Sequence, residues 1–311
     1  PFIRKLAESP VIVYATMHST GDHQRSRLEC SERYVAASGK GFTEERAILS
    51  CIGEAVERFC CGFTPSHTLL LSEASALGQA FLHPQAVLNF SDDQYENRSK
   101  DHDSDGGLPH VGFNWVPPRF NEELPIGWVQ GREILTGEPV LFPAALTFFS
   151  YPRNSEHLYG LADSNGCAAG ASLQDALLRG LLELIERDGC GIWWYNMLRT
   201  KGLDLSDCRD GDILSVIDAQ KRLNRDVSLL DISTDLNIPV CAAISSRRGR
   251  NIRIGLGASL TWKAAAKRAL SEMCQVSLIN VDGIPKNTFD PVRADMMALC
   301  RFQWKLTSQQ T

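Results

Sequence analysis

The stretch ERAILSCIGEAVERF, residues 45–59, recurs along the chain as DALLRGLLELIERDG, residues 175–189. The two copies share an alanine, two glutamates and an arginine at a constant offset of 129 positions: Ala47/Ala176, Glu54/Glu183, Glu57/Glu186 and Arg58/Arg187. A weaker third copy lies a further 89 positions along and contributes Ala265, Arg268, Glu272 and Gln275. The spacing of these residues predicts three helices of one kind.

Each predicted helix follows a hydroxyl residue that suits an N-cap: Thr43, Ser172 and Thr261. At about 100° per residue, Ser50, Glu54 and Glu57 share one narrow stripe of the first helix. The same stripe holds Arg179, Glu183 and Glu186 in the second helix, with Asp175 beside it, and Arg268, Glu272 and Gln275 in the third. Because the second helix is apolar around its stripe, we predict that it meets little bulk water and that its carboxylates face a cleft.

Length and composition exclude several classes of protein. With 311 residues, 43% of them apolar and 22% charged, the chain can build a full core, so disorder is excluded for the whole. Its net charge of −5 gives no general attraction to nucleic acid or to an anionic membrane. The longest mainly apolar run, residues 140–149, falls short of the roughly 20 residues that span a bilayer. Ten cysteines without a C-x-x-C motif favour a reduced, cytoplasmic protein.

The remaining sequence predicts antiparallel sheets between the helices. A hairpin is expected from residues 126–134 and 140–149, which are joined by the turn residues TGEP. Three further β-rich runs have the short polar connections of antiparallel pairing: 226–234, 238–246 and 251–259. The polar stretch 89–110 predicts a long loop or a disordered insertion. We therefore predict one α+β domain over residues 1–311, with the acid-bearing helices packed on antiparallel sheets.

The repeated glutamates point to a bound cation. An ordinary i, i+4 ion pair such as Glu54 with Arg58 stabilises a helix by about 0.2–0.5 kcal/mol. This is too little to offset the free-energy cost of placing two like charges on a largely apolar helix. Ligands that are all oxygen suit Mg²⁺, which often shares its coordination with phosphates. Four arginines close to the acids suit phosphate charge, so we predict a nucleoside triphosphate: Arg58, Arg179, Arg187 and Arg268. A di-iron site is the weaker alternative, because it needs Glu-x-x-His.

Two glycine-rich segments and one aromatic segment have less specific patterns. Lys40, in Ser38-Gly39-Lys40-Gly41 before the first helix, is either a phosphate contact or part of a common loop, and the segment is not a Walker A motif. Gly255-Leu256-Gly257 predicts a strand-to-helix turn rather than a dinucleotide site. Residues 193–195, WWY, follow the second repeat and are expected to be core or interface anchors.

Three separated motifs carry a resemblance: SGKGFTEERAILSCIGEAVERF (38–59), SNGCAAGASLQDALLRGLLELIERDG (164–189) and RALSEMCQ (268–275). Together they resemble the YcaO family in order and spacing over most of the chain. The continuation GIWWYN (191–196) is most similar to the azoline-forming cyclodehydratases of ribosomal peptide natural-product pathways. The resemblance implies a Mg²⁺-dependent ATP site that activates a peptide amide. It also implies that Cys, Ser or Thr residues of a ribosomal precursor peptide are converted to thiazoline or oxazoline.

The resemblance also implies roles for single residues. The principal metal ligands would be Glu54, Glu57, Glu183 and Glu186, with Glu272 and Gln275 completing the site. Contacts to the nucleotide, or support of the carboxylates, would come from Lys40, Ser50, Arg58, Asp175, Arg179, Arg187, Arg268 and Gln275. Catalysis is expected to depend most on Glu54, Glu186 and Arg187.

The chain departs from the family pattern in two places. Many members have Asn followed four residues later by Glu where this chain has Ala171 and Asp175, so one nucleotide contact is either lost or replaced by a shorter acid. Cyclodehydratases tend to end in a proline-rich tail, whereas the last proline here is Pro291, so either a tail is missing or the chemistry is impaired. The chain also starts at Pro1 without Met, which suggests that its natural N-terminus lies upstream.

Partners and alternatives follow from the resemblance as well. Peptide-processing members usually rely on a leader-peptide-binding protein, and such a partner is expected here because no obvious domain of that kind is present. Thioamidation of a peptide, with sulfide as nucleophile, is one alternative activity. A non-catalytic accessory or scaffold role is another, and the oligomeric state is open, with a homodimer among the alternatives.

Overall fold

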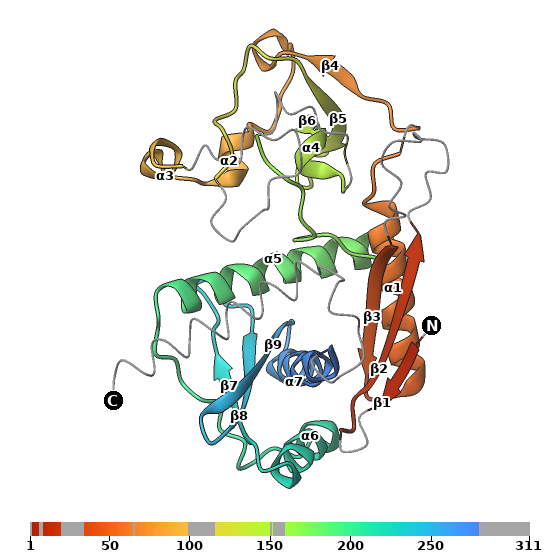
Figure 1. Cartoon of the computed structure of the whole chain (residues 1–311), viewed down its shortest axis with the longest axis vertical. Helices are drawn as coiled ribbons and strands as arrows, with labels where there is room; N and C mark the ends of the chain where they lie inside the picture. The colour runs from red at the N-terminus through yellow and green to blue at the C-terminus, as the bar shows by residue number, and fades with distance from the viewer. Residues whose placement is uncertain are drawn as a thin grey trace. The chain divides into compact units, whose positions relative to one another are not determined.

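The computed structural model of the chain describes residues 2–5, 9–19, 34–64, 66–98, 116–149, 151 and 159–279 (Figure 1). Contacts within the chain group it into two compact units: unit 1 comprises Pro1–Gly21, Ser26–Arg58 and Asn165–Thr311, and unit 2 comprises Asp22–Arg25 and Phe59–Ser164. Every candidate site residue lies in unit 1. The sequence predicts a single domain over residues 1–311. Because one domain can contain two compact units, the single domain stays a prediction.

In the described part of unit 1 there are two antiparallel three-stranded sheets, each followed by a helix. The first sheet consists of β1 (Phe2–Lys5), β2 (Ile12–Ser19) and β3 (Tyr34–Gly41), and α1 (Glu44–Cys60) follows it. The second consists of β7 (Asp226–Asp231), β8 (Val240–Arg247) and β9 (Arg250–Ala258), followed by α7 (Trp262–Ile279). The three β-rich runs predicted after residue 225 are therefore confirmed. The repeat seen in the sequence also extends from single helices to whole sheet-and-helix units.

The last strand of each sheet carries a Gly-x-Gly pair that lets the following helix approach its backbone. A Cβ atom added to Gly39 would lie 2.0 Å from the backbone nitrogen of Cys51 in α1. One added to Gly255 would lie 2.2 Å from the backbone nitrogen of Met273 in α7. Only glycine permits so close an approach. The predictions of a loop for the first pair and a strand-to-helix turn for the second are wrong, because both pairs lie within strands.

The three predicted helices and their N-caps are confirmed. They are α1, α7 and α5 (Leu173–Tyr195). The hydroxyl oxygen of Ser172 accepts a hydrogen bond from the backbone N–H of Asp175 at 3.2 Å. Thr43 and Thr261 accept equivalent bonds three residues into their own helices, each at 3.3 Å. These caps fix where each helix begins, and hence the depth at which its acidic residues lie.

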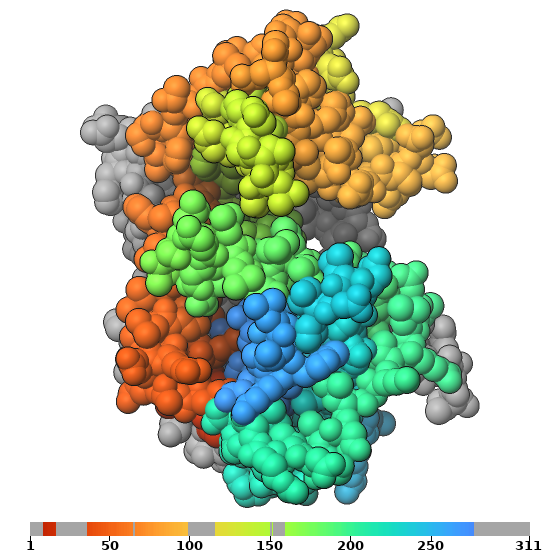
Figure 2. Space-filling model, turned by 180° about the vertical axis from the view of Figure 1, so that it is seen from behind, coloured from red at the N-terminus to blue at the C-terminus, as the bar shows by residue number. Residues whose placement is uncertain are grey.

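Helix α5 differs from its prediction in length and in exposure. It includes residues 193–195, which were expected to follow it, because Trp193 packs with Ile185 and Val240 in a core cluster between α5 and the second sheet. The prediction that little of α5 meets solvent is wrong, since five of its leucines are at least 40% exposed: Leu173, Leu177, Leu178, Leu181 and Leu184. The sheet covers one face of the helix, and Figure 2 shows the neighbouring layer, in which the second sheet and α7 pack with α6 (Gly211–Arg222).

The described residues of unit 2 form a smaller antiparallel sheet and four short helices. Its strands are β4 (Leu70–Ser72), β5 (Ile126–Arg132) and β6 (Pro139–Pro143), and its core surrounds the fully buried Trp128. The helices are η1 (Ala74–Ala76), α2 (Pro84–Leu88), α3 (Asp92–Glu96) and α4 (Ala144–Thr147).

The predicted hairpin of unit 2 is confirmed as β5 and β6, but its second arm stops at Pro143, where α4 begins. Of the loop predicted over residues 89–110, the part up to residue 98 includes α3, which a capping box at Ser91 starts. The rest of that prediction lies outside the described residues. In the described part of the chain, we find no helix with the length and apolar character needed to cross a bilayer.

Candidate active site

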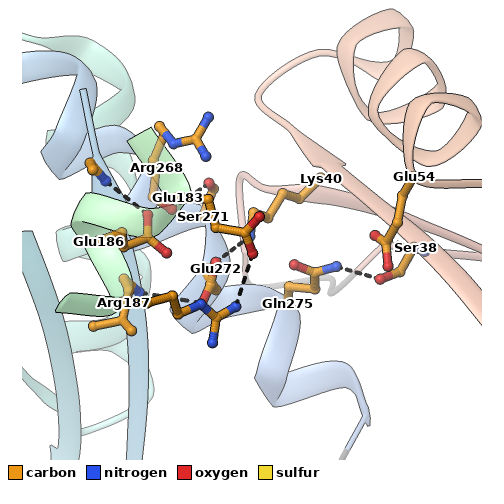
Figure 3. Close-up of polar contacts among 12 residues, drawn as sticks. Ser38, Lys40, Glu54, Glu183, Glu186, Arg187, Arg268, Ser271, Glu272 and Gln275 are labelled. Atoms are coloured by element: carbon orange, nitrogen blue, oxygen red, sulfur yellow. Dashed lines mark hydrogen bonds and ion pairs between the residues drawn. The ribbon is translucent and has the colours of Figure 1, made fainter. Parts of the chain in front are cut away.

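Residues from β3, α1 and α7 are linked by a chain of polar contacts (Figure 3). The ammonium nitrogen of Lys40 lies 2.7 Å from Oε2 of Glu272. Nε2 of Gln275 donates a hydrogen bond to Oγ of Ser38 at 2.7 Å, and the backbone N–H of Ser38 donates to Oε2 of Glu54 at 3.3 Å. Strand β3 thus joins the acid-bearing stripe of α1 to that of α7.

Strand β9 supports a carboxylate from α5 and another from α7. The backbone N–H of Ala258 donates to Oε2 of Glu186 at 2.8 Å, and that of Leu256 donates to Oε1 of Glu272 at 3.4 Å. Glu186 is only 5% exposed. A buried acid held by a backbone donor has a fixed orientation, so Glu186 is the most constrained glutamate of the site.

Glu186 and Glu272 have opposite pKa shifts. Burial and the nearby charge of Glu272 raise the pKa of Glu186 to about 7, against the attraction of Arg268. Burial also opposes ionisation of Glu272, but the Lys40 ammonium and the Arg187 guanidinium outweigh it and hold the pKa of Glu272 below its ordinary value. At neutral pH the pair therefore carries more charge on Glu272 than on Glu186.

A second like-charged pair forms between α1 and α5, from Glu57 and Glu183. Burial raises the pKa of Glu57 to about 7 despite the attraction of Arg58, and the charges of Glu183 and Glu54 add to the effect. Burial likewise raises the pKa of Glu183, although Arg187 Nη2 donates to its Oε1 at 3.4 Å. Arg58 lies 3.7 Å from Glu54 and 3.9 Å from Glu57.

Arg187 faces both carboxylate pairs. Partial desolvation would lower the pKa of this half-exposed guanidinium, but the charges of Glu272, Glu183 and Glu186 outweigh that effect and raise it. One guanidinium is thus shared by acids from two helices. Acids from α5 and α7 thus lie near one guanidinium, and their roles as metal ligands stay predictions.

The donor set of the two pairs fits a hard divalent cation. In the described part of the chain, no three acid, histidine or cysteine side chains are grouped closely enough to hold a metal ion. The pairs offer carboxylate oxygens alone, and the raised pKa values of Glu57, Glu183 and Glu186 mean that these three acids ionise less readily without a nearby cation. Mg²⁺ needs only one or two carboxylates, since water and phosphate oxygens complete its shell. Glu54, Glu57, Glu183, Glu186 and Glu272 stay the predicted ligands.

Asp175, Arg179 and Ser50 lie apart from the carboxylate pairs. Asp175 accepts from the Ala171 backbone N–H at 3.1 Å and from Nε of Arg179 at 2.9 Å, and the bond from Arg179 holds its pKa below the ordinary value. Ser50 is exposed on α1, one turn before Glu54. Among the described contacts, none joins these residues to the paired acids, so their predicted nucleotide contacts stay predictions.

The sequence interpretation missed three groups that hold the acids in place. They are the backbone N–H groups of Ser38, Leu256 and Ala258, which donate to Glu54, Glu272 and Glu186. Ser38 precedes the first Gly-x-Gly pair, and Leu256 and Ala258 lie within and just after the second. These two pairs were the sequence signal that could have pointed to the three groups. Backbone donors carry no side-chain signature, so only the fold identifies the two in β9.

The raised pKa values predict that the metal-free protein loses stability as the pH rises. Glu57 and Glu186 have pKa values of about 7 in the folded state against 4.5 for an unperturbed glutamate. Their protonated forms favour the folded state, so this contribution is complete below about pH 4.5 and is lost as the pH passes 7. We expect a loss of about 1–3 kcal/mol per acid, seen as a lower Tm at about pH 8 than at about pH 5 in EDTA. An E57Q/E186Q variant should show a weaker pH dependence, and an unchanged one would contradict the assignment.

Comparison with known proteins identifies the family. The family described as YcaO cyclodehydratase, ATP- and Mg²⁺-binding, matches residues 38–309. The chain belongs to the YcaO family. The α+β fold expected from the sequence, with helices on antiparallel sheets, is confirmed as the fold of YcaO heterocyclases.

The chain is also similar to three known proteins. An uncharacterized protein of Methanothermobacter thermautotrophicus is 26% identical over 84% of this chain and 61% of its own length. A heterocyclase solved in complex with substrate and cofactor is 33% identical, with a TM-score of 0.72 over 80% of this chain and 33% of that one. YcaO from Methanopyrus kandleri, solved with AMPPCP and Mg²⁺, is 21% identical, with a TM-score of 0.60 over 91% of this chain and 63% of that one. The last likeness is one of fold, and the chain spans less than two thirds of each protein.

Proposed function

We propose that this protein uses Mg²⁺ and ATP to activate a backbone amide of a ribosomal precursor peptide, and so cyclodehydrates Cys, Ser or Thr residues. The observation that carries the proposal is the meeting of acids from three helices as two like-charged pairs. Arg187 is shared by both pairs, and Lys40 contacts Glu272 of the pair that Glu272 forms with Glu186. Such pairs in a YcaO protein are best explained by a polyphosphate bound with divalent cations.

The proposed reaction removes one water from the peptide. The thiol or hydroxyl of the reacting residue gives up its proton to water and adds to the preceding amide carbonyl, and the resulting oxyanion takes the γ-phosphoryl group of ATP, which releases ADP. Loss of phosphate, together with the amide proton, forms the C=N bond of the thiazoline or oxazoline. Phosphorylation is needed because an amide oxygen is otherwise a poor leaving group.

The residues of the site would divide this work by charge. Bound Mg²⁺ would supply positive charge that neutralises the polyphosphate. Glu54, Glu57, Glu183, Glu186 and Glu272 would hold the cations. Arg58, Arg187 and Arg268 would face phosphate oxygens, where a fixed guanidinium stabilises the charge of the transferring group. Lys40 would orient Glu272 through its 2.7 Å contact.

Turnover with a peptide tests the proposal. Incubation with Mg²⁺, ATP and a candidate precursor peptide should release phosphate and lower the peptide mass by one water per ring. EDTA should abolish both effects. Phosphate release without a change in peptide mass, under conditions where the peptide is bound, would contradict the cyclodehydration.

Two alternatives remain distinguishable by the same assay. With sulfide present, thioamidation would exchange oxygen for sulfur rather than remove water. An accessory role is favoured by one observation: the Asp175 carboxylate is engaged by Ala171 and Arg179 of its own segment, which leaves it poorly placed to contact a nucleotide. Calorimetry with Mg²⁺ and ATP separates this case, because an accessory protein without nucleotide affinity gives no heat.

A leader-peptide-binding protein is the partner that we propose for the peptide substrate. The heterocyclase that resembles this chain was solved with its substrate and is far longer, since the chain covers 33% of it. Adding a candidate leader-binding protein should lower the KM for the precursor peptide and leave the KM for ATP unchanged.

A further inference from the structure

Two copies of the repeat hold their first glutamate with an equivalent backbone donor. In the first copy the backbone N–H of Ser38 donates to Glu54 at 3.3 Å, and Figure 3 shows the two residues side by side. In the third copy the backbone N–H of Leu256 donates to Glu272 at 3.4 Å. Each donor lies 16 residues before its acid, in the last strand of the sheet that precedes the helix. The two sheet-and-helix units therefore hold an acid in the same way.

A glycine next to each donor brings the helix close enough for this contact. A Cβ atom added to Gly39 would lie 2.0 Å from the backbone nitrogen of Cys51. One added to Gly257 would lie 2.6 Å from the backbone nitrogen of Ala269. Cys51 and Ala269 are equivalent in the repeat, because each lies three residues before its acid. In both units the strand supplies the glycine and the helix supplies a residue with a side chain.

The middle copy has the same close approach, but its glycine is on the helix. The equivalent position is Gly180, three residues before Glu183, and a Cβ atom added there would lie 2.4 Å from the carbonyl oxygen of Gly166. Residues 166–170 form no strand, and Ala168 stands where the other two copies have glycine. The glycine has therefore moved from the segment to the helix, while the close approach of the two backbones is kept.

Gly166 also provides a donor to the acid of this copy. Burial raises the pKa of Glu183, and a hydrogen bond from the backbone N–H of Gly166 is one of the interactions that oppose this effect. The φ angle of Gly166 is +80°, in the left-handed region that glycine adopts without strain. Both glycines are thus needed where they lie, Gly166 because of its own conformation and Gly180 because of the carbonyl group that packs on it.

We propose that Gly166 is a positioning residue for Glu183, and that position 180 is glycine so that Gly166 can lie against α5. An acid that accepts from a fixed backbone donor is restricted to few orientations, as metal ligands are by the groups behind them. The fold itself would then orient one glutamate from each of the three helices. The three donors are Ser38, Gly166 and Leu256. What Glu183 holds, a divalent cation with ATP, rests on the proposed function, but how Glu183 is held does not.

Hydrogen exchange of the Gly166 amide tests the donor in the metal-free protein. Asn165–Gly166 is the one Asn–Gly pair of the chain, so the full chain with ¹³C-carbonyl asparagine and ¹⁵N-glycine gives a single NMR signal for this amide. Glu183→Ala removes the acceptor and should speed exchange of the Gly166 amide in EDTA by at least about tenfold. Glu54→Ala removes the equivalent acid of α1, and this matched control should leave the rate unchanged. Equal rates in the wild type and Glu183→Ala would overturn the proposal.

Gly180→Ala tests the role of the close approach. The added Cβ would push the Gly166 carbonyl away from α5 and move the Gly166 N–H out of reach of Glu183. Below its Tm, this variant should bind Mn²⁺ in the presence of ATP at least about tenfold more weakly, as measured by electron paramagnetic resonance of the free ion. Gly191→Ala is the matched control and should keep the wild-type affinity, because it lies in the same helix and no atom lies within 4 Å of its added Cβ.

The outcomes separate the positioning of Glu183 from the proposed function. Gly180→Ala with the Mn²⁺ affinity of Gly191→Ala would overturn the positioning role even if its Tm falls, because a loss of stability alone is a structural effect. A wild type that binds no Mn²⁺ with ATP, while its Gly166 amide still responds to Glu183→Ala, would contradict the proposed function and support the positioning role. The exchange experiment needs no change at Gly180, so it decides the proposal even where Gly180→Ala fails to fold.

Discussion

The variant E186Q is expected to lose ATP turnover by about 100-fold or more while keeping its fold. Glu186 is the most buried acid of the site, and the repulsion between it and Glu272 is the cost that bound cations would relieve. Removal of one fixed charge from a preorganised electrostatic site commonly costs about 10²–10³ in rate. Phosphate release at saturating peptide measures the loss, and the Mg²⁺ requirement of the residual activity should shift to higher concentration.

The shape of glutamine makes this test selective for charge. Glutamine keeps an oxygen that can accept the hydrogen bond from the Ala258 backbone N–H, and it resembles the protonated form that Glu186 approaches at neutral pH. The Tm of E186Q in EDTA should therefore equal or exceed that of the wild type at about pH 8. D188N is the matched control, because Asp188 is exposed on the same helix, two residues further on. Wild-type turnover in E186Q would refute a role for this carboxylate in holding the cations.

The local part of this fold could be predicted from the sequence. The N-caps at Thr43, Ser172 and Thr261 fix the first turn of each helix, and a 3.6-residue period then places every acid of the repeat. Both features depend on residues close together in the sequence, so no tertiary information was needed. The same holds for the β5–β6 hairpin and for the meander of β7, β8 and β9, whose turns are short.

The parts that escaped prediction depend on contacts between distant segments. The Gly-x-Gly pairs have the composition of a loop, and only the packing of α1 and α7 shows that glycine is required for close approach within a strand. The apolar surface of α5 indicates burial, but how much of it a sheet covers is a tertiary property. The pairing of Glu57 with Glu183, and of Glu186 with Glu272, likewise follows from how three helices pack. The sequence predicts that acids gather but not which acids become neighbours.

The largest stability change is expected from Gly39→Ala. The added Cβ would lie 2.0 Å from the backbone nitrogen of Cys51 and 2.2 Å from the carbonyl oxygen of Ala47, and these atoms cannot move without shifting α1. Overpacking of this kind commonly costs about 1–3 kcal/mol, and we expect the upper end because the clash is with backbone. For a chain of this size that corresponds to a fall in Tm of about 6–12 °C. Thermal unfolding followed by circular dichroism measures it.

Gly53→Ala, in the helix α1 that packs on Gly39, provides the control. No atom lies within 4 Å of a Cβ added at Gly53, and alanine is the better helix former by about 0.5–1 kcal/mol, so this variant should unfold at an equal or higher temperature. The contrast separates close approach from any general effect of glycine. Because β3 also carries Lys40, the G39A shift should weaken the pair between Lys40 and Glu272 and lower ATP turnover even where the protein is folded. A Tm for G39A equal to that of G53A would show that β3 does not pack directly against the backbone of α1. It would also contradict the proposed contacts from Ser38 and Lys40 to the acids.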